Sequence, residues 1–236
     1  MSNDKMKKPA GNKKGLFSII LGLLLLAAAL LLVIYNYYDA YLAELDSEFY
    51  KNALLEDMEG YVPDEDLMWD TYLDSQDPNR KMPTIMIGEE EFIGVLEVPL
   101  YSLALPVMSE CDYRKLKHAP CVYSGTYYRN DLVICAHNYR KHFSNLKWIP
   151  EGSEIRLIAV DGATYTYEVK EIETLKPTAV KEMTVPENRE WDMTLFTCTT
   201  GGQARAAVRC VLKDKTPPKY MSDEWYEMPE TNKRKT

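Results

Sequence analysis

Cys198 ends an apolar run, TLFTC at residues 194–198, and is followed by two glycines and by Arg205. A thiol attacks carbon as its thiolate, and with an ordinary pKa of ~8.5 it is mostly protonated at neutral pH. Arg205 offers a permanent charge after a short turn, from which the chain can return on an antiparallel strand. It also suits the stabilisation of an oxyanion, because a guanidinium does not lose its proton. In a period-2 pattern Arg209 lies on the same strand face as Arg205, but deeper. We therefore predict that Arg205, rather than Arg209, acts beside Cys198.

A base for this thiol must come from the 3 histidines of the chain. His137 is the best placed, because it ends a β-rich run and precedes Asn138, so its ring can emerge at a strand end near Cys198. A hydrogen-bonded structural histidine is the alternative. His118 and His142 lie in lysine-rich, loop-like sequence and are expected to be solvated.

The remaining cysteines offer other chemistry. The chain has 5 cysteines, so in an oxidising compartment at least one is unpaired or bonded to another chain. Cys111, His118 and Cys121 could bind zinc, but their spacing lacks the usual short cysteine pair and a fourth ligand. A disulfide between Cys111 and Cys121 is the favoured alternative. We expect no metal and no cofactor.

Residues 16–35 are uncharged and long enough to cross the ~30 Å hydrocarbon core as a helix. A cleavable signal peptide is the alternative, although its apolar region is usually shorter. Lysines precede this run and an acidic segment follows it, so the positive-inside rule places the N-terminus in the cytoplasm. We therefore predict a single-pass membrane protein whose later residues lie outside.

The chain beyond this segment reads as a stalk and one β-rich domain. The net charge of -8 argues against nucleic-acid binding. An acidic stretch follows the apolar run, and within it Trp69 and Asp70 are candidates for a lid. The β-rich runs are separated by turn residues and predict an all-β, closed eight-stranded barrel with short helices, preceded by one transmembrane helix. These runs are residues 92–98, 103–107, 131–137, 154–160, 164–175, 193–198 and 204–212. The expected parts are a basic segment (1–15), the membrane anchor (16–35), an acidic stalk (36–82), the catalytic domain (83–214) and a polar tail (215–236).

Three motifs within residues 91–212 resemble the sortases, cell-surface transpeptidases of Gram-positive bacteria. TLFTC resembles their nucleophile strand, VICAHN at residues 133–138 their histidine strand, and RAAV at 205–208 their R-x-x-V strand; FIGVLEVPLYSLALPV at 92–107 resembles their opening strands. Ala136 stands where the family usually has glycine. The resemblance implies that Cys198 is the nucleophile, His137 the catalytic histidine and Arg205 the catalytic arginine, with Thr197 contacting the substrate.

The resemblance also implies partners. They are surface proteins that carry a C-terminal LPxTG-like sorting signal, and an amine from a peptidoglycan precursor or a pilin. Residues 176–192 are short for the insertion of class B enzymes, which favours a class A, D or E-like member and leaves a lidded pilin polymerase open. A non-catalytic peptide-binding barrel and a hydrolytic cysteine protease are the alternatives.

Overall fold

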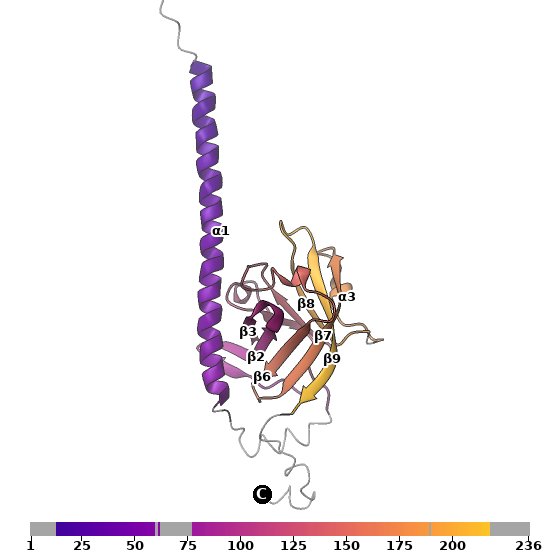
Figure 1. Cartoon of the computed structure of the whole chain (residues 1–236). Coiled ribbons are helices and arrows are strands. Elements are labelled where there is room, and N and C mark those ends of the chain that lie inside the picture. Colours follow the sequence, from indigo (N-terminus) through magenta and orange to yellow (C-terminus); the bar gives the residue numbers. More distant parts are fainter. Residues whose placement is uncertain (1–12, 60, 62–76, 189, 218–236) are drawn as a thin grey trace, which may run out of the picture. The chain divides into compact units, whose positions relative to one another are not determined.

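The computed structural model describes residues 13–59, 61, 77–188 and 190–217. Figure 1 shows the elements, which divide between two compact units, residues 1–41 and residues 42–236. The helices are α1 (Lys13–Glu59), α3 (Val180–Met183) and the 3-10 turns η2 (Pro99–Tyr101), η3 (Lys115–Lys117) and η4 (Leu146–Trp148). The strands are β1 (Ile85–Ile87), β2 (Glu90–Val98), β3 (Leu103–Met108), β4 (Cys121–Ser124), β5 (Leu132–Ala136), β6 (Glu154–Ala159), β7 (Thr164–Leu175), β8 (Met193–Cys198) and β9 (Arg205–Thr216).

The first unit contains the apolar part of α1. Among the described residues, α1 is the one helix that is long and apolar enough to cross a membrane, and none of its most apolar window is buried. Leucine and isoleucine side chains such as Leu24 and Ile34 are more than half exposed. Length and composition of this kind fit a membrane anchor and an N-terminal signal sequence alike.

The end of α1, residues 42–59, belongs to the second unit. Leu54 is fully buried there in a cluster with Phe92 of β2, and the ring of Tyr50 lies 5.2 Å from that of Phe92. Two ion pairs add to this packing, Asp46 with His118 at 2.8 Å and Glu44 with Lys141 at 3.2 Å. Because these charges are partly exposed, the apolar contact is the larger stabilising contribution.

His142 is completely buried, so the expectation that it is solvated was wrong. Its lysine-rich neighbourhood suggested a surface loop, but Phe143 and Leu146 turn this segment into the core, and the ring of Tyr139 packs 5.5 Å away. Burial lowers the pKa of His142 to about 4, and the nearby His137 lowers it as well. His142 is therefore neutral at physiological pH.

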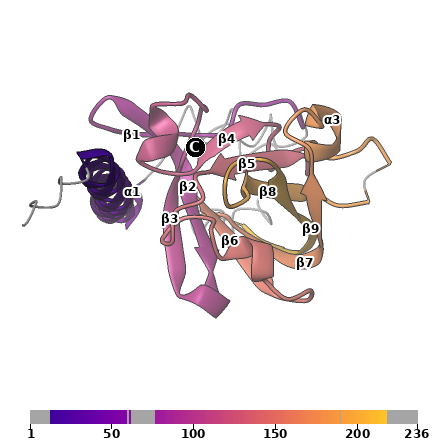
Figure 2. The ribbon, with the colours of Figure 1, turned by 90° about the horizontal axis from the view of Figure 1, so that it is seen from above.

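The nine strands of the second unit form one sheet in the order β1-β2-β3-β4-β5-β8-β9-β7-β6. The last strand of this order, β6, also pairs with β2, and Figure 2 shows these two strands side by side. The β-rich fold and the strands at all the predicted runs are confirmed. β1 and β4 were missed, because three or four residues are too few to show a period-2 pattern.

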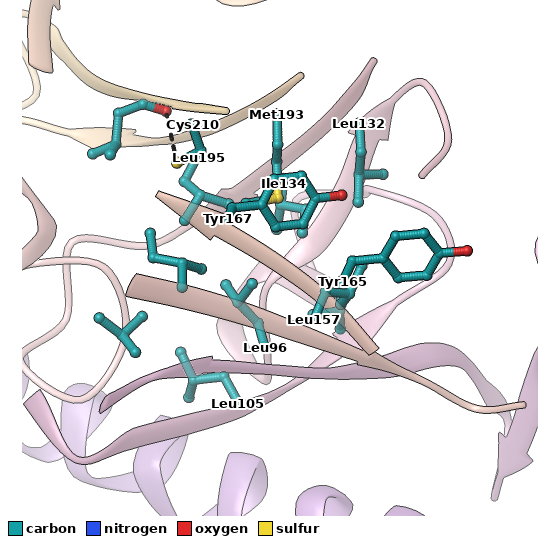
Figure 3. Close-up of a cluster of buried hydrophobic side chains, with 14 of the residues drawn as sticks. Leu96, Leu105, Leu132, Ile134, Leu157, Tyr165, Tyr167, Met193, Leu195 and Cys210 are labelled. Carbon is teal, nitrogen blue, oxygen red and sulfur yellow. Dashed lines mark hydrogen bonds between the residues drawn. The ribbon is translucent and has the colours of Figure 1, made fainter. Parts of the chain in front are cut away.

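The two faces of each strand carry different residues. Leu132, Ile134 and Ala136 of β5 lie in the main core cluster, together with Met193 and Leu195 of β8. Figure 3 shows side chains from several strands meeting in this core, among them Leu96, Leu157 and Leu195. The intervening residues form a second cluster on the opposite face, here called the outer cluster: Val133, Cys135, Leu175, Met183, Phe196 and Ala207. This alternation decides which way the predicted site residues point.

Gly94 marks a bulge where β2 shifts its register against β3. Its φ is +153°, and a Cβ there would lie 2.1 Å from the carbonyl oxygen of Ile158 on β6. Only glycine allows the two backbones to approach so closely.

Candidate active site

β8 places Cys198 between two strands that carry the other predicted residues. It runs parallel to β5, and the last pair of that ladder is Ala136 with Thr197. His137 and Cys198 are therefore the next residues along two neighbouring strands that run in the same direction. Alternation puts both side chains on the face of the outer cluster, since Cys135 and Phe196 lie there and are two residues earlier.

Arg205 lies directly opposite Cys198 in the antiparallel pairing of β8 with β9. Directly opposed residues project to the same face, so the guanidinium and the thiol share the side that His137 also occupies. Arg205 is half-buried, and its Nη1 donates to the carbonyl oxygens of Gly202 and Ala204, both at 3.2 Å. The register thus brings together the three residues that the sequence predicted.

The connection between β8 and β9 holds this arrangement. The backbone N–H of Thr199 donates to the carbonyl oxygen of Ala204 at 2.9 Å, and that of Gly202 to the carbonyl oxygen of Thr199 at 2.8 Å. Gly201 and Gly202 have φ of +85° and +73°, which glycine adopts without a steric cost. The two glycines after the cysteine are thus explained by the turn that brings Arg205 back.

Thr197 faces the interior of the sheet. It is 2% exposed, and its hydroxyl donates a hydrogen bond of 2.8 Å to the carbonyl oxygen of Ala136. Alternation is the reason, because Thr197 has the parity of Leu195, which is buried in the main core cluster. Its hydroxyl therefore joins β8 to β5 one residue before Cys198 and His137.

Arg209 occupies the same face of β9 as Arg205 but is fully buried. Its guanidinium donates to Thr194 Oγ1 and Glu173 Oε2, each at 3.1 Å, and to the carbonyl oxygen of Glu182. It also lies 4.4 Å from the ring centre of Trp191. These contacts use both terminal nitrogens of the guanidinium within the protein, which favours Arg205 as the residue that meets a substrate.

Two tyrosines pack on His137, and neither was predicted. The ring of Tyr139 lies 4.9 Å from the imidazole, and that of Tyr113 meets it edge to face at 5.9 Å. Tyr139 is only two residues from His137 and was open to prediction, whereas Tyr113 comes from the connection between β3 and β4. The two rings restrict the orientation of the half-buried imidazole.

The zinc hypothesis finds no support in the placement of its residues. His118 Nδ1 lies 2.8 Å from Asp46, while Cys111 lies 3.0 Å, sulfur to sulfur, from Cys135. Within the described ranges, no group of three or more His, Cys, Asp or Glu side chains is placed to hold a metal ion. The lid candidates Trp69 and Asp70 lie outside the described residues.

A pocket of about 270 Å³ lies apart from these residues. It is lined by the end of α1, β3 and residues 140–145, including Glu44, Lys51 and Arg140. None of the predicted site residues lines it.

The sortase domain model matches residues 96–213, while no curated protein matches the chain. Sortase C of Streptococcus pneumoniae is 19% identical with a TM-score of 0.57, covering 71% of this chain and 98% of that one. Sortase D5 of Clostridium perfringens is 16% identical with a TM-score of 0.54, covering 72% and 99%. Sortase C of Clostridium perfringens, solved with the C-terminal cell wall sorting motif, is 20% identical with a TM-score of 0.53, covering 70% and 97%.

At 16% to 20% identity, these solved structures show a shared fold. The match to the sortase domain model adds evidence from the sequence for membership of the family. The match covers half of the 236 residues and includes β8, most of β9 and His137. The protein therefore belongs to the sortase family.

Proposed function

We propose that this chain is a membrane-anchored cysteine transpeptidase that cleaves an LPxTG-like sorting signal and joins the shortened protein to an amine. The register of β8 carries the proposal, because Cys198 lies opposite Arg205 and one step beyond the pair of Ala136 with Thr197. This arrangement supports a thiol, an imidazole and a guanidinium acting at one strand end.

In the first half of the proposed reaction, the thiolate of Cys198 attacks the carbonyl carbon that follows the threonine of the signal. The guanidinium of Arg205 stabilises the oxyanion that forms. When the carbon–nitrogen bond breaks, His137 gives a proton to the leaving amine. The products are a thioester on Cys198 and the released C-terminal peptide.

In the second half, an acceptor amine attacks the thioester and His137 takes the proton that the amine loses. The carbon–sulfur bond breaks, a new amide forms and Cys198 is restored. The acceptor class is a peptidoglycan precursor or a pilin lysine. The resemblance in fold to a sortase C described in terms of pilin substrate specificity supports the pilin alternative.

Other parts of the proposal concern placement. The N-terminus lies in the cytoplasm, residues 16–35 cross the membrane, and residues 36–82 separate this anchor from the catalytic domain at 83–214, with a polar tail after it. The pairing of β2 with β6 supports a closed eight-stranded barrel made of β2 to β9. Thr197 serves as a positioning residue through its bond to Ala136, and meets a substrate only through its backbone.

The test uses the full chain in detergent, with a panel of sorting-signal peptides, with and without an amine acceptor, and reads intact mass. We expect a thioacyl adduct that disappears in Cys198→Ala and resolves to an amide when the amine is present. Cys210→Ala is the matched control, since burial raises the pKa of the Cys210 thiol and it lies in the main core cluster.

Two outcomes would contradict the proposal. Hydrolysis that is never diverted by added amine would identify a cysteine protease. Binding of the peptides without an adduct, unchanged in Cys198→Ala, would identify a peptide-binding module.

A further inference from the structure

Three thiols meet beside the proposed active site. Cys121 of β4 and Cys135 of β5 are partners in the antiparallel ladder, and Cys111 comes from the connection that precedes β4. The sulfur of Cys111 lies 3.0 Å from that of Cys135. A disulfide has an S–S length of about 2.05 Å, so these two sulfurs need to approach by about 1 Å to bond.

The three thiols have unequal chemistry. Hydrogen bonds from the thiols of Cys121 and Cys135 lower the pKa of Cys111, whereas the pKa values of those two thiols are raised by their bonds to Cys111 and by burial. Cys111 is half-exposed, while Cys135 is 4% exposed and Cys121 is fully buried. Cys111 is thus the more acidic and the more accessible of two thiols whose sulfurs are in contact. Redox-active cysteine pairs have this division into an attacking and a resolving thiol.

We propose that Cys111 and Cys135 form a reversible disulfide by exchange with a small external disulfide such as oxidised glutathione. The thiolate of Cys111 attacks one sulfur of the external disulfide and forms a mixed disulfide with it, while the other sulfur leaves as a thiolate with both electrons of the broken bond. Cys135 then loses its proton and attacks Cys111, and the second external thiolate leaves. The protein gives up two hydrogens, and one external disulfide becomes two thiols.

Cys121 is the less suitable partner. Its sulfur lies 3.4 Å from the carbonyl oxygen of Ala119, and it packs in the cluster that contains Leu54 and Phe92. The pair first considered from the sequence, Cys111 with Cys121, is therefore replaced by Cys111 with Cys135. Cys135 instead lies on the outer face, with its sulfur in contact with that of Cys111.

The disulfide would act on the histidine through two short connections. Tyr113 is two residues from Cys111, and His137 is two residues from Cys135. The ring of Tyr113 meets the imidazole of His137 edge to face at 5.9 Å, although Tyr113 is 74% exposed. Oxidation fixes the segment that carries Tyr113 to β5, which ends one residue before His137. Reduction leaves this segment held by non-covalent contacts, among them the bond from the backbone N–H of Arg114 to Asp112.

The experiment uses the full chain in detergent with Cys198→Ser, so that the proposed nucleophile does not enter the exchange. The protein is equilibrated in glutathione buffers from reducing to oxidising, free thiols are alkylated, and proteolytic peptides are identified by mass. We expect one linked pair of peptides containing Cys111 and Cys135, which returns to free thiols under reduction. Cys135→Ser should abolish the link, and Cys210→Ser, as the matched control, should leave it.

A link between Cys111 and Cys121, or glutathione retained on Cys111 without an internal link, would overturn the assignment. The Cys198→Ser protein itself shows which cysteines become linked. A folding defect in the further variant Cys135→Ser therefore does not decide the test. Hydrogen exchange of residues 109–114 provides the second readout, and we expect it to slow about tenfold on oxidation. Equal exchange in both forms would overturn the effect on Tyr113. This inference rests on the proposed function only for placing the three thiols in an oxidising compartment. Neither readout measures activity, so a failure of the transpeptidation proposal would not change the result of this test.

Discussion

Replacing Arg209 by methionine separates a structural arginine from the proposed catalytic one. Methionine keeps much of the buried stem but removes the donors to Thr194, Glu173 and Glu182. Thr194 Oγ1 retains a bond of 2.9 Å from Trp191 Nε1, and the Glu173 side chain is 52% exposed and regains water. The main loss is therefore the charged donor to the carbonyl oxygen of Glu182. Together with the contact to the Trp191 ring, this loss predicts a decrease of about 2 to 3 kcal/mol in the free energy of unfolding.

A domain of this size should then melt about 8 °C lower. The comparison variant is Arg205→Met, which loses only two bonds to nearby backbone oxygens at a half-exposed site. Its stability should change by less than about 0.5 kcal/mol. Its kcat/KM should nevertheless fall by about 10² to 10³, the usual cost of losing one oxyanion donor.

The assay combines thermal unfolding with turnover of a sorting-signal peptide, measured well below both melting temperatures. Arg209→Met should lose stability and keep turnover per folded molecule, and Arg205→Met should do the reverse. If folded Arg209→Met is inactive while Arg205→Met turns over normally, the assignment from strand register is refuted.

Three further predictions follow from the fold. Thr197→Val should lower the free energy of unfolding by about 1 kcal/mol and reduce kcat, because it removes the hydroxyl that donates to the buried carbonyl oxygen of Ala136. Thr197→Ser should restore both, and an unchanged kcat in Thr197→Val would contradict the positioning role of Thr197. Gly94→Ala should cost more than about 2 kcal/mol in urea unfolding, since its Cβ would meet a backbone oxygen at 2.1 Å, whereas Gly88→Ala, with nothing within 4 Å, should cost about 1 kcal/mol. The pKa of His142 is lowered from 6.5 to about 4, so on acidification the unfolded state binds a proton at a higher pH than the folded state does. The free energy of unfolding should therefore fall by up to about 3 kcal/mol as the pH drops from 6.5 to 4. His142→Phe should remove that part of the pH dependence, and an identical pH profile in the variant would show that another group is responsible.

The sequence predicted the strands other than β1 and β4, and the placement of Arg205 beside Cys198, because the relevant information is local. Cys198 and Arg205 are separated by six residues that contain two glycines, and a hairpin connection of this kind leaves little choice of pairing. His137 was predicted from its place at the end of an apolar run. Period-2 alternation then sets the face of each side chain, although it was not applied to Thr197, whose hydroxyl points inward.

The features that were missed depend on contacts between segments distant in the sequence. Cys111 and Cys135 are 24 residues apart, and the pairings of β4 with β3 and with β5 bring them together. Tyr113 reaches His137 through the same connection. The burial of His142 likewise depends on packing that its lysine-rich neighbours do not reveal. Local patterns carry no information on such contacts.

The division between strands and connections has a consequence for how this enzyme can diversify. Cys198, His137 and Arg205 are attached to three adjacent strands, whereas the residues that cover the outer cluster come largely from the connections 109–120 and 176–192. Insertions and deletions in those connections can therefore change which peptides fit while the spacing of the three groups is inherited unchanged. A single residue inserted between Thr194 and Cys198 would have the opposite effect, because it would turn the thiol from the outer face toward the interior. Variation among related chains should accordingly be rich in length changes in the connections and almost free of them in β8.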